Sequence, residues 1–493
     1  MPRDVRVPVI PTWSDIVKTL QHYIDGAFVE PAHDAGRFAV INPATEQQVA
    51  QILMGSASDA ERAVAAAHRA FPSWAAEPLE RRLAHLERLL AVYERRYTEM
   101  AEAITTEMGA PRDLSAHAQA ASGTGHIQET LTAARALDWQ VRLRGGALVV
   151  REPVGVCGLI TPWNWPMNQV CAKVAPALAA GCTVVLKPSE QAPLSAQLFA
   201  EFLHEAGFPA GVFNMVHGTG PSVGHALAVH PDVDMMSFTG STRAGISVAK
   251  AAADTVKRVA QELGGKSPNI VFADADLEVA VRTGVAHCFS NTGQSCNAPT
   301  RMLVEDSVYE RAVQIAVAAG AAIAVGDPTK PGKHLGPVAS RMQFDKIQRC
   351  IEQGIAEGAR LALGGPGRPE GFEVGYYVRP TIFADVNNTM SVAREEIFGP
   401  VLSMLRFGTL EEAVRIANDT PYGLAAYVQT RDLDKARRVA QQLRAGSVYL
   451  NGSPQDYDAP FGGFKQSGNG REGGTYGLVE FLEYQVINGY YAD

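Results

Sequence analysis

Short apolar runs and helical stretches alternate along the middle of the chain. Four runs of apolar or β-branched residues, typical of buried strands, occupy residues 156–161, 183–187, 212–216 and 233–239. A turn and a segment of helical periodicity follow each run. This alternation predicts a doubly wound parallel sheet, in which ligands bind beyond the carboxyl ends of the strands.

The flanking segments carry weaker patterns. Residues 1–20 read as a lead-in, 22–29 and 37–42 as short strands, and 58–69 as a helix with an acidic first turn. Leu83, Leu86, Leu90 and Tyr93 recur at helical spacing and predict one packing helix over 79–108. Further on, the pattern predicts a strand ending at Glu262, helices over 277–290 and 312–325, and a strand over 479–488.

Composition narrows the class of protein. The chain has 493 residues, enough for two or three domains, with 46% hydrophobic and 19% charged residues. Its net charge of -8 argues against nucleic-acid and anionic-membrane partners and favours small-molecule chemistry. The apolar stretch at 312–325 is shorter than the ~20 residues that a membrane span requires. With no basic, apolar leader, we expect no export and a cytoplasmic protein.

The six cysteines predict neither a disulfide framework nor a metal site, because none has CxxC or Cys/His ligand spacing. Cys296 differs from the others, since small and polar neighbours (Thr292, Gly293, Gln294, Ser295 and Asn297) leave its sulfur approachable. A thiol in such a loop is a candidate nucleophile. On local composition alone, an inert cysteine remains the commoner alternative.

Other polar residues stand at the predicted strand ends. Lys187 and Glu190 follow one strand, and two interpretations are open. They form a solvated ion pair, or Lys187 donates to a ribose and Glu190 accepts from it. The turn from Gly240 to Gly245 is glycine-rich without spelling GxGxxG, so alone it is a weak sign of a dinucleotide site. Glu262 precedes two glycines and is either a structural cap or a general base for the thiol.

Together the motifs resemble those of the NAD(P)-dependent aldehyde dehydrogenase superfamily, in that family's order, from about residue 22 to the C-terminus. They are Pro162-Trp-Asn-Trp-Pro166, Lys187-Pro-Ser-Glu190, Phe238-Thr-Gly-Ser-Thr242, Glu262-Leu-Gly-Gly-Lys-Ser-Pro-Asn269, Gly293-Gln-Ser-Cys296, Glu396-Ile-Phe-Gly-Pro400 and Pro460-Phe-Gly-Gly-Phe-Lys465. The resemblance implies an α/β fold with a Rossmann-like cofactor domain (21–132 and 153–263), an α/β catalytic domain (264–464) and a small β bridging element (133–152 and 465–493). It also implies a homodimer or homotetramer.

The same resemblance implies roles for single residues. Cys296 is the nucleophile, Glu262 the base that activates water, and Asn164 an oxyanion donor, with Lys173 and Glu472 on a proton path to Glu262. The implied cofactor residues are Thr161, Trp163, Lys187, Glu190, Gly220, Gly240, Ser241, Leu263, Glu396 and Phe398. Of the pair Glu395 and Glu396, the latter matches the family's ribose-binding position. NAD is expected over NADP, because the Glu190 carboxylate would repel a 2′-phosphate.

The substrate wall is predicted from helical spacing. Trp165, Asn168, Gln169 and Ala172 share one face, and by resemblance that face lines the aldehyde tunnel. Tyr457 and Phe461 are expected on the opposite wall. Ala172 stands where family members often have a large aromatic residue, and no arginine is evident. We therefore expect medium or bulky uncharged aldehydes to be preferred over succinic semialdehyde and acetaldehyde.

Two other classes of protein fit some of these residues. A Cys–Glu–Lys hydrolase of the nitrilase type requires a thiol, a carboxylate and a lysine, but it has no use for four cofactor-like turns. The second class is a non-catalytic protein on the same fold, but such a protein would not need Cys296, Glu262 and Asn164 together.

Overall fold

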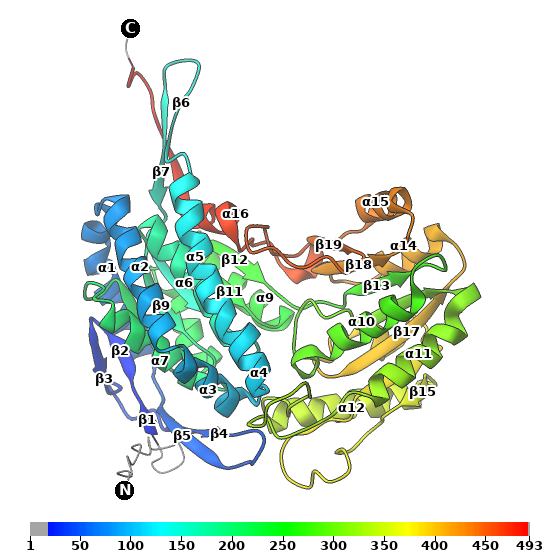
Figure 1. Cartoon of the computed structure of the whole chain (residues 1–493). Helices are drawn as coiled ribbons and strands as arrows, with labels where there is room; N and C mark the ends of the chain where they lie inside the picture. Colours follow the sequence, from blue (N-terminus) through cyan, green and yellow to red (C-terminus); the bar gives the residue numbers. More distant parts are fainter. Residues whose placement is uncertain (1–17, 492–493) are drawn as a thin grey trace, which may run out of the picture.

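The computed structural model describes residues 18–491, and its strands form four sheets (Figure 1). Two seven-stranded sheets lie in two bodies that face one another, with helices packed around each. The mixed α/β class expected from the sequence is confirmed. None of the helices in the described part of the chain is long and apolar enough to cross a membrane.

The first large sheet has the strand order β12-β11-β8-β9-β10-β2-β3. Its parallel part comprises β12 (Arg258–Glu262), β11 (Met235–Thr239), β8 (Val156–Ile160), β9 (Thr183–Lys187) and β10 (Phe213–Met215). The segments that join these strands contain α6 (Pro166–Ala180), α7 (Pro193–Glu205), α8 (His225–Val229) and α9 (Thr242–Ala252). The predicted doubly wound parallel sheet is therefore present.

The N-terminal prediction is wrong in two places. Residues 22–29 form a hairpin of β2 (His22–Ile24) and β3 (Ala27–Val29), which turns at Asp25 and Gly26, both with positive φ. The expected lead-in ends in β1 (Lys18–Leu20), which pairs in a small sheet with β5 (Gln48–Leu53), and β4 (Arg37–Ile41) completes that sheet. The rest of the expected lead-in lies outside the described residues.

The predicted helix over 79–108 is two helices. α2 (Leu79–Arg95) and α3 (Tyr97–Met108) meet at Arg96, whose φ of -103° and ψ of 21° are not helical. The Arg96 guanidinium bonds Glu99 and Glu201, and its position over the Phe202 ring ties the break to α7. A tertiary contact therefore interrupts a sequence that contains no Gly or Pro at this point.

Helices α1 (Ala57–Ala75), α4 (Arg112–Leu114) and α5 (Ala120–Ala136) complete the body around the first sheet. Its main core gathers large side chains such as Leu86, Tyr93, Phe199 and Phe202 between the sheet and these helices. The centre of α5 packs closely on α6, the helix that carries the predicted substrate face. The helix packing therefore holds the predicted substrate residues in a rigid setting.

The second large sheet has the order β15-β16-β17-β14-β13-β18-β19. Its strands are β13 (Pro268–Val271), β14 (Arg301–Glu305), β15 (Arg360–Leu363), β16 (Thr381–Ala384), β17 (Val401–Phe407), β18 (Ala425–Gln429) and β19 (Ser447–Leu450). Its helices are α10 (Leu277–Phe289), α11 (Tyr309–Ala321), α12 (Arg341–Ala356), α13 (Ser391–Arg394), α14 (Leu410–Asn418) and α15 (Leu433–Gln442).

The remaining three strands form an arm that projects from the first body (Figure 1). They are β6 (Gln140–Arg142), β7 (Leu148–Pro153) and β20 (Leu482–Ile487), in the order β20-β7-β6. The short α16 (Gly474–Val479) leads into β20, so the strand expected over 479–488 begins three residues later. β20 has no partner on its outer side among the described strands.

Candidate active site

The loop that carries Cys296 leaves the end of α10 and returns to β14. Asn291 and Thr292 both have positive φ in this loop, a conformation uncommon for residues with a side chain. Such backbone strain is typical of functional sites. Gly265 lies directly under the loop, where a β-carbon would come within 2.4 Å of the Cys296 carbonyl oxygen. The Gly-Gly turn after β12 therefore allows the thiol loop to approach closely.

Asn164 fixes this loop from the opposite side. Its Nδ2 donates to the Gln294 carbonyl oxygen at 3.0 Å, and its own carbonyl oxygen accepts from Asn291 at 2.8 Å. The neighbouring Trp165 donates through Nε1 to Ser295 Oγ at 2.8 Å. An amide group has two N–H donors, so the second N–H of Asn164 remains for another acceptor. The predicted pair of Asn164 and Cys296 is thus brought together.

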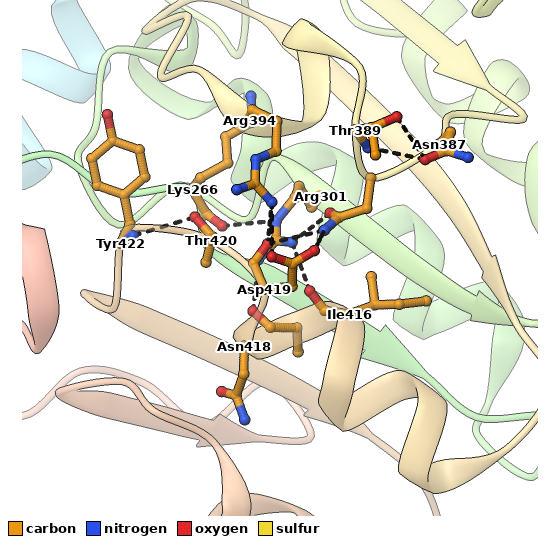
Figure 2. Close-up of polar contacts among 12 residues, drawn as sticks. Lys266, Arg301, Asn387, Thr389, Arg394, Ile416, Asn418, Asp419, Thr420 and Tyr422 are labelled. Carbon is orange, nitrogen blue, oxygen red and sulfur yellow. Dashed lines mark hydrogen bonds and ion pairs between the residues drawn. The ribbon is translucent and has the colours of Figure 1, made fainter.

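A buried arginine anchors the far end of the thiol loop. Arg301 Nε donates to the Lys266 carbonyl oxygen at 3.0 Å, and its two terminal nitrogens reach the carbonyl oxygens of Ile416 and Ala417 (Figure 2). The guanidinium therefore connects β14 to Lys266, which precedes β13, and to the C-terminal end of α14. Arg394 and Asp419 form an ion pair beside it (Figure 2). From the sequence, Glu395 could be either solvated or paired with Arg394; it is exposed, and Arg394 pairs with Asp419 instead.

Glu262 ends β12 as predicted, and its carboxylate is 4% exposed. Neither carboxylate oxygen has a hydrogen-bond partner among the described residues. Burial and the nearby Glu472 raise the pKa of the Glu262 carboxyl well above its usual value, while Lys173 and Arg471 act in the opposite direction. An unpartnered buried carboxyl with a raised pKa is a candidate acid or base.

The thiol shares this electrostatic environment. Burial raises the pKa of Cys296, and the carboxylates of Glu396, Glu262 and Glu472 raise it further. The free thiol is therefore protonated at neutral pH, so a base must accept its proton before the sulfur can attack.

Lys173 and Glu472, which the resemblance places on a proton path and which a structural ion pair would equally explain, form a largely buried ion pair. Lys173 Nζ binds Glu472 Oε1 and lies 3.1 Å from Ser237 Oγ. A small cavity lined by Ala172, Ser237, Glu262 and Glu472 has room for about one water molecule. The cavity therefore lies beside the carboxyl groups of both Glu262 and Glu472.

The predicted cofactor residues gather at the carboxyl ends of β8, β9 and β11. Thr161 Oγ1 and the nearby Thr239 Oγ1 are buried and have no partner in the described chain, so each retains an unused hydrogen-bonding group. Lys187 Nζ lies 3.4 Å from Glu190, and burial lowers the pKa of Lys187. The two unpartnered threonine hydroxyls are groups that can hydrogen-bond the hydroxyls of a ribose.

The N-terminus of α9 lies next to Thr239 and is a candidate anion site. Ser241 caps its first turn by accepting from the Ala244 N–H, and Gly240 bonds the Glu262 carbonyl oxygen through its N–H at 3.1 Å. The N-terminus of an eleven-residue helix offers unpaired N–H groups and a partial positive charge to a pyrophosphate. Gly220 lies at the edge of this area, where a β-carbon would meet nothing within 4 Å.

The last group of predicted cofactor residues comprises Glu396, Phe398 and Leu263. Glu396 accepts from the Gly265 N–H at 3.0 Å, and Phe398, at a φ of 62°, packs edge-on against Trp163 with ring centroids 5.5 Å apart. Leu263 is buried, with its N–H on the Ser467 carbonyl oxygen. Burial raises the pKa of the Glu396 carboxyl.

Two residues of α12 that sequence reasoning missed hold this segment. Lys346 Nζ donates to the Glu396 carbonyl oxygen at 2.8 Å, and Gln343 Nε2 donates to Phe398 at 2.7 Å and to Ile397 at 3.1 Å. These bonds fix the strained backbone at Phe398. In the sequence both residues look like ordinary polar positions of an amphipathic helix, so no local signal distinguishes them.

The predicted substrate residues divide into two groups. Trp165 lies beside the thiol loop, whereas Ala172, two turns along α6, lines small cavities next to Glu262 and His126. Gln169 is buried with an unpartnered Oε1, and Asn168 accepts from its amide at 3.4 Å. Phe461 exchanges two backbone hydrogen bonds with Glu472, and Tyr457 is 39% exposed at the surface. His126, which packs against Tyr457, was not predicted.

A model of the aldehyde dehydrogenase family matches residues 28–487. The chain belongs to the aldehyde dehydrogenase family. Family membership assigns this dehydrogenase the oxidation of aldehydes to carboxylic acids with a nicotinamide cofactor, as the sequence predicted.

Named relatives agree with this assignment. The 3-succinoylsemialdehyde-pyridine dehydrogenase of a Pseudomonas species is 55% identical over 95% of this chain and 98% of its own. An aldehyde dehydrogenase from Bartonella henselae is 51% identical with a TM-score of 0.94, covering 96% and 99% of the two chains. Aldehyde dehydrogenase C of Pseudomonas syringae, solved with NAD+ and octanal, is 50% identical with a TM-score of 0.96, covering 98% and 100%.

Proposed function

We propose that the dehydrogenase uses Cys296 as its nucleophile and Glu262 as its base, with medium or bulky uncharged aldehydes as substrates and NAD as the preferred cofactor. The observation that carries the proposal is the convergence of Cys296, Asn164 and the unpartnered Glu262 carboxyl on one loop system. The cofactor, when bound, supplies the hydride acceptor.

The nucleophilic step depends on the removal of the thiol proton. Glu262 is the carboxylate with unused acceptor capacity that faces this site, and the resulting Cys296 thiolate attacks the aldehyde carbon. Negative charge then develops on the aldehyde oxygen. The free N–H of Asn164, held in place by the Gln294 carbonyl oxygen, and the Cys296 backbone N–H stabilise that charge.

The second half of the reaction releases the acid. After hydride transfer Cys296 would carry a thioester, and Glu262 would still hold the proton taken from the thiol. Glu262 must release that proton before it can deprotonate the water that cleaves the thioester, and it must release the second proton afterwards. The Lys173–Glu472 pair, beside a cavity that has room for about one water molecule, gives that proton a route away from the thioester.

The preference for NAD rests on Glu190. Its carboxylate lies at the end of β9 within reach of Lys187 Nζ, so a 2′-phosphate at this ribose meets a like charge. We expect kcat/KM to be higher with NAD than with NADP. Equal values for both cofactors would refute this preference without affecting the enzyme class.

The substrate class follows from the walls and agrees with the relatives. The side chains of Ala172, Asn168 and Gln169 are themselves uncharged. Glu129 lines one of the cavities at Ala172, and the acidic residues Asp456 and Asp458 flank Tyr457, so a carboxylate-bearing aldehyde meets repulsion. One relative is named for a pyridine semialdehyde, and the structure of another contains octanal.

The domain division and assembly are part of the proposal. The first large sheet would belong to a cofactor domain (21–132 and 153–263), the second to a catalytic domain (264–464), and the arm to a bridging element (133–152 and 465–493). Exposed Tyr484 and Val486 on β20, whose outer edge is unpaired among the described strands, support a homodimer or homotetramer built through the arm. We place the enzyme in the cytoplasm.

The central test compares the parent with Cys296→Ala and Cys288→Ala. NADH formation at 340 nm with octanal should disappear in Cys296→Ala, while NAD binding, measured by calorimetry, stays near the parental affinity. Cys288 lies buried in α10 and serves as the matched control, which should retain most of its turnover. Dehydrogenase turnover near the parental rate in Cys296→Ala would exclude this thiol as the nucleophile.

A further inference from the structure

A histidine outside the predicted site lies beside the substrate face of α6. His126 belongs to α5, is 8% exposed, and its Nε2 has no hydrogen-bond partner in the described part of the chain. It lines a small cavity together with Ala172 of α6 and Glu129 of α5. A buried polar atom without a partner is costly, so its retention points to a partner supplied by water or by a ligand.

The imidazole is held in a defined position. Its ring packs perpendicular to the Tyr457 ring, with centroids 5.1 Å apart. Gly125 makes room for that tyrosine, because a β-carbon there would already lie 3.3 Å from the Tyr457 ring. A glycine inside a helix costs stability, and here it permits the contact between α5 and the loop that carries Tyr457.

His126 is also an uncharged group. Burial lowers the pKa of its imidazole to about 4, while Glu472 and the Asn168 side chain act in the opposite direction. A neutral imidazole offers one donor and one acceptor and can therefore bind a carbonyl oxygen, a hydroxyl or a ring nitrogen. The charged groups that face it are acidic: Glu129 and Glu472, with Asp456 and Asp458 next to Glu129.

The position along α6 relates the cavity of His126 to the thiol loop. Trp165, which bonds the residue before Cys296, and Ala172, which shares the cavity of His126, are seven residues apart on this helix. At 1.5 Å per residue, they are separated by roughly 10 Å along the helix axis.

We propose that His126 is a specificity-determining residue that hydrogen-bonds an uncharged polar group on the tail of the aldehyde, beside Ala172 and two turns along α6 from Trp165. This inference rests on the proposed function and adds the chemistry of the tail to it. The favoured substrate carries a ring nitrogen, a second carbonyl or a hydroxyl at its far end. A purely hydrocarbon tail of the same size leaves Nε2 unpaired.

The test uses two aldehydes of the same shape, 4-(pyridin-3-yl)butanal and 4-phenylbutanal, with the NAD-loaded full-length enzyme at pH 8. We expect the parent to favour the pyridyl aldehyde in kcat/KM by about three- to tenfold, the value of one hydrogen bond. In His126→Phe, which keeps a ring against Tyr457, this ratio should fall to about one. His126→Gln, which keeps a hydrogen-bonding group, should retain part of the preference.

Thr130→Val provides a matched control, because Thr130 lines the same cavity on the same helix. This variant should change kcat/KM for both aldehydes alike and preserve their ratio. A purely structural role of His126 would likewise lower both values together. An unchanged ratio in His126→Phe, or no preference in the parent, would overturn the inference.

The pH dependence separates His126 from the acidic residues. If the pyridyl preference arises only at a pH low enough to protonate pyridine, the carboxylates recognise a cation and the role of His126 is refuted. If the parent oxidises neither of these aldehydes nor octanal, the proposed function fails as well. Oxidation of both without discrimination overturns this inference alone.

Discussion

Gly265→Ala tests whether the close approach of the Gly-Gly turn positions the thiol. The new methyl group would lie 2.4 Å from the Cys296 carbonyl oxygen and 3.2 Å from Leu424 Cβ, whereas ordinary contacts begin at 3.4 Å. The oxygen belongs to the backbone, so the thiol loop must move by about 1 Å, and a displacement of that size can lower a reaction rate by about 100-fold.

The stability cost of the same change should be modest. Overpacking of this kind costs about 1–3 kcal/mol, which a domain of this size survives in the folded state. We therefore expect kcat/KM for octanal to fall by about 100-fold, with a small decrease in Tm. The rate of Cys296 alkylation by iodoacetamide should change too, because the sulfur moves with its loop.

Gly145→Ala is the control, since a β-carbon at that turn meets nothing within 4 Å. It should retain parental kcat/KM and Tm. Activity of Gly265→Ala within threefold of the parent would show that the thiol loop adapts freely, and that the close approach of the two backbones has no role in positioning Cys296.

Three more predictions concern the base, the wall and acid stability. Glu262→Gln should acylate but hydrolyse slowly, so rapid mixing should show a burst of roughly one NADH per active subunit; an unchanged steady-state rate would make Glu262 structural. Ala172→Leu fills small cavities, so kcat/KM for octanal should fall about tenfold more than for acetaldehyde, and an equal loss would contradict a wall at this position. The pKa of buried His22 is lowered to about 4, below its unfolded value of 6.5, so stability is present above pH 6.5 and lost as pH falls through 4. His22→Gln should remove part of that acid sensitivity, up to about 3 kcal/mol in denaturant titrations, and an identical pH profile would be inconsistent with this cause.

The strand ends were predictable because buried parallel strands have a strong local signature. Thr183–Lys187 and Met235–Thr239 are fully buried runs, and the polar residues that follow them lie where the sheet requires. The break at Arg96 could not be foreseen, since it depends on contacts with Glu201 and Phe202 of a distant helix. Long-range contacts of this kind override helical periodicity.

The candidate site shows the same division. Cys296 and Glu262 could be predicted because the residues around each have an unusual local composition. The resemblance to a family then predicted that the two side chains share one site. His126, Gln343 and Lys346 were missed because each is a single polar residue on an otherwise ordinary helix. Their importance depends on contacts that the sequence does not show. His126 has a buried ring nitrogen without a partner in the described chain, and Gln343 and Lys346 donate to the carbonyl oxygens of Phe398 and Glu396.

The buried position of Arg301 determines how this part of the protein should respond to high ionic strength. Its guanidinium is fully buried and receives its compensation from backbone carbonyl oxygens and Asn388, with two of those carbonyls at the negative end of α14. Dissolved salt screens exposed charges over a distance that is about 10 Å at 0.1 M and shorter at higher concentration, whereas buried charges are screened much less. Concentrated brine should therefore weaken the exposed ion pairs of the molecule before it disturbs the buried contacts that hold the loop of Cys296.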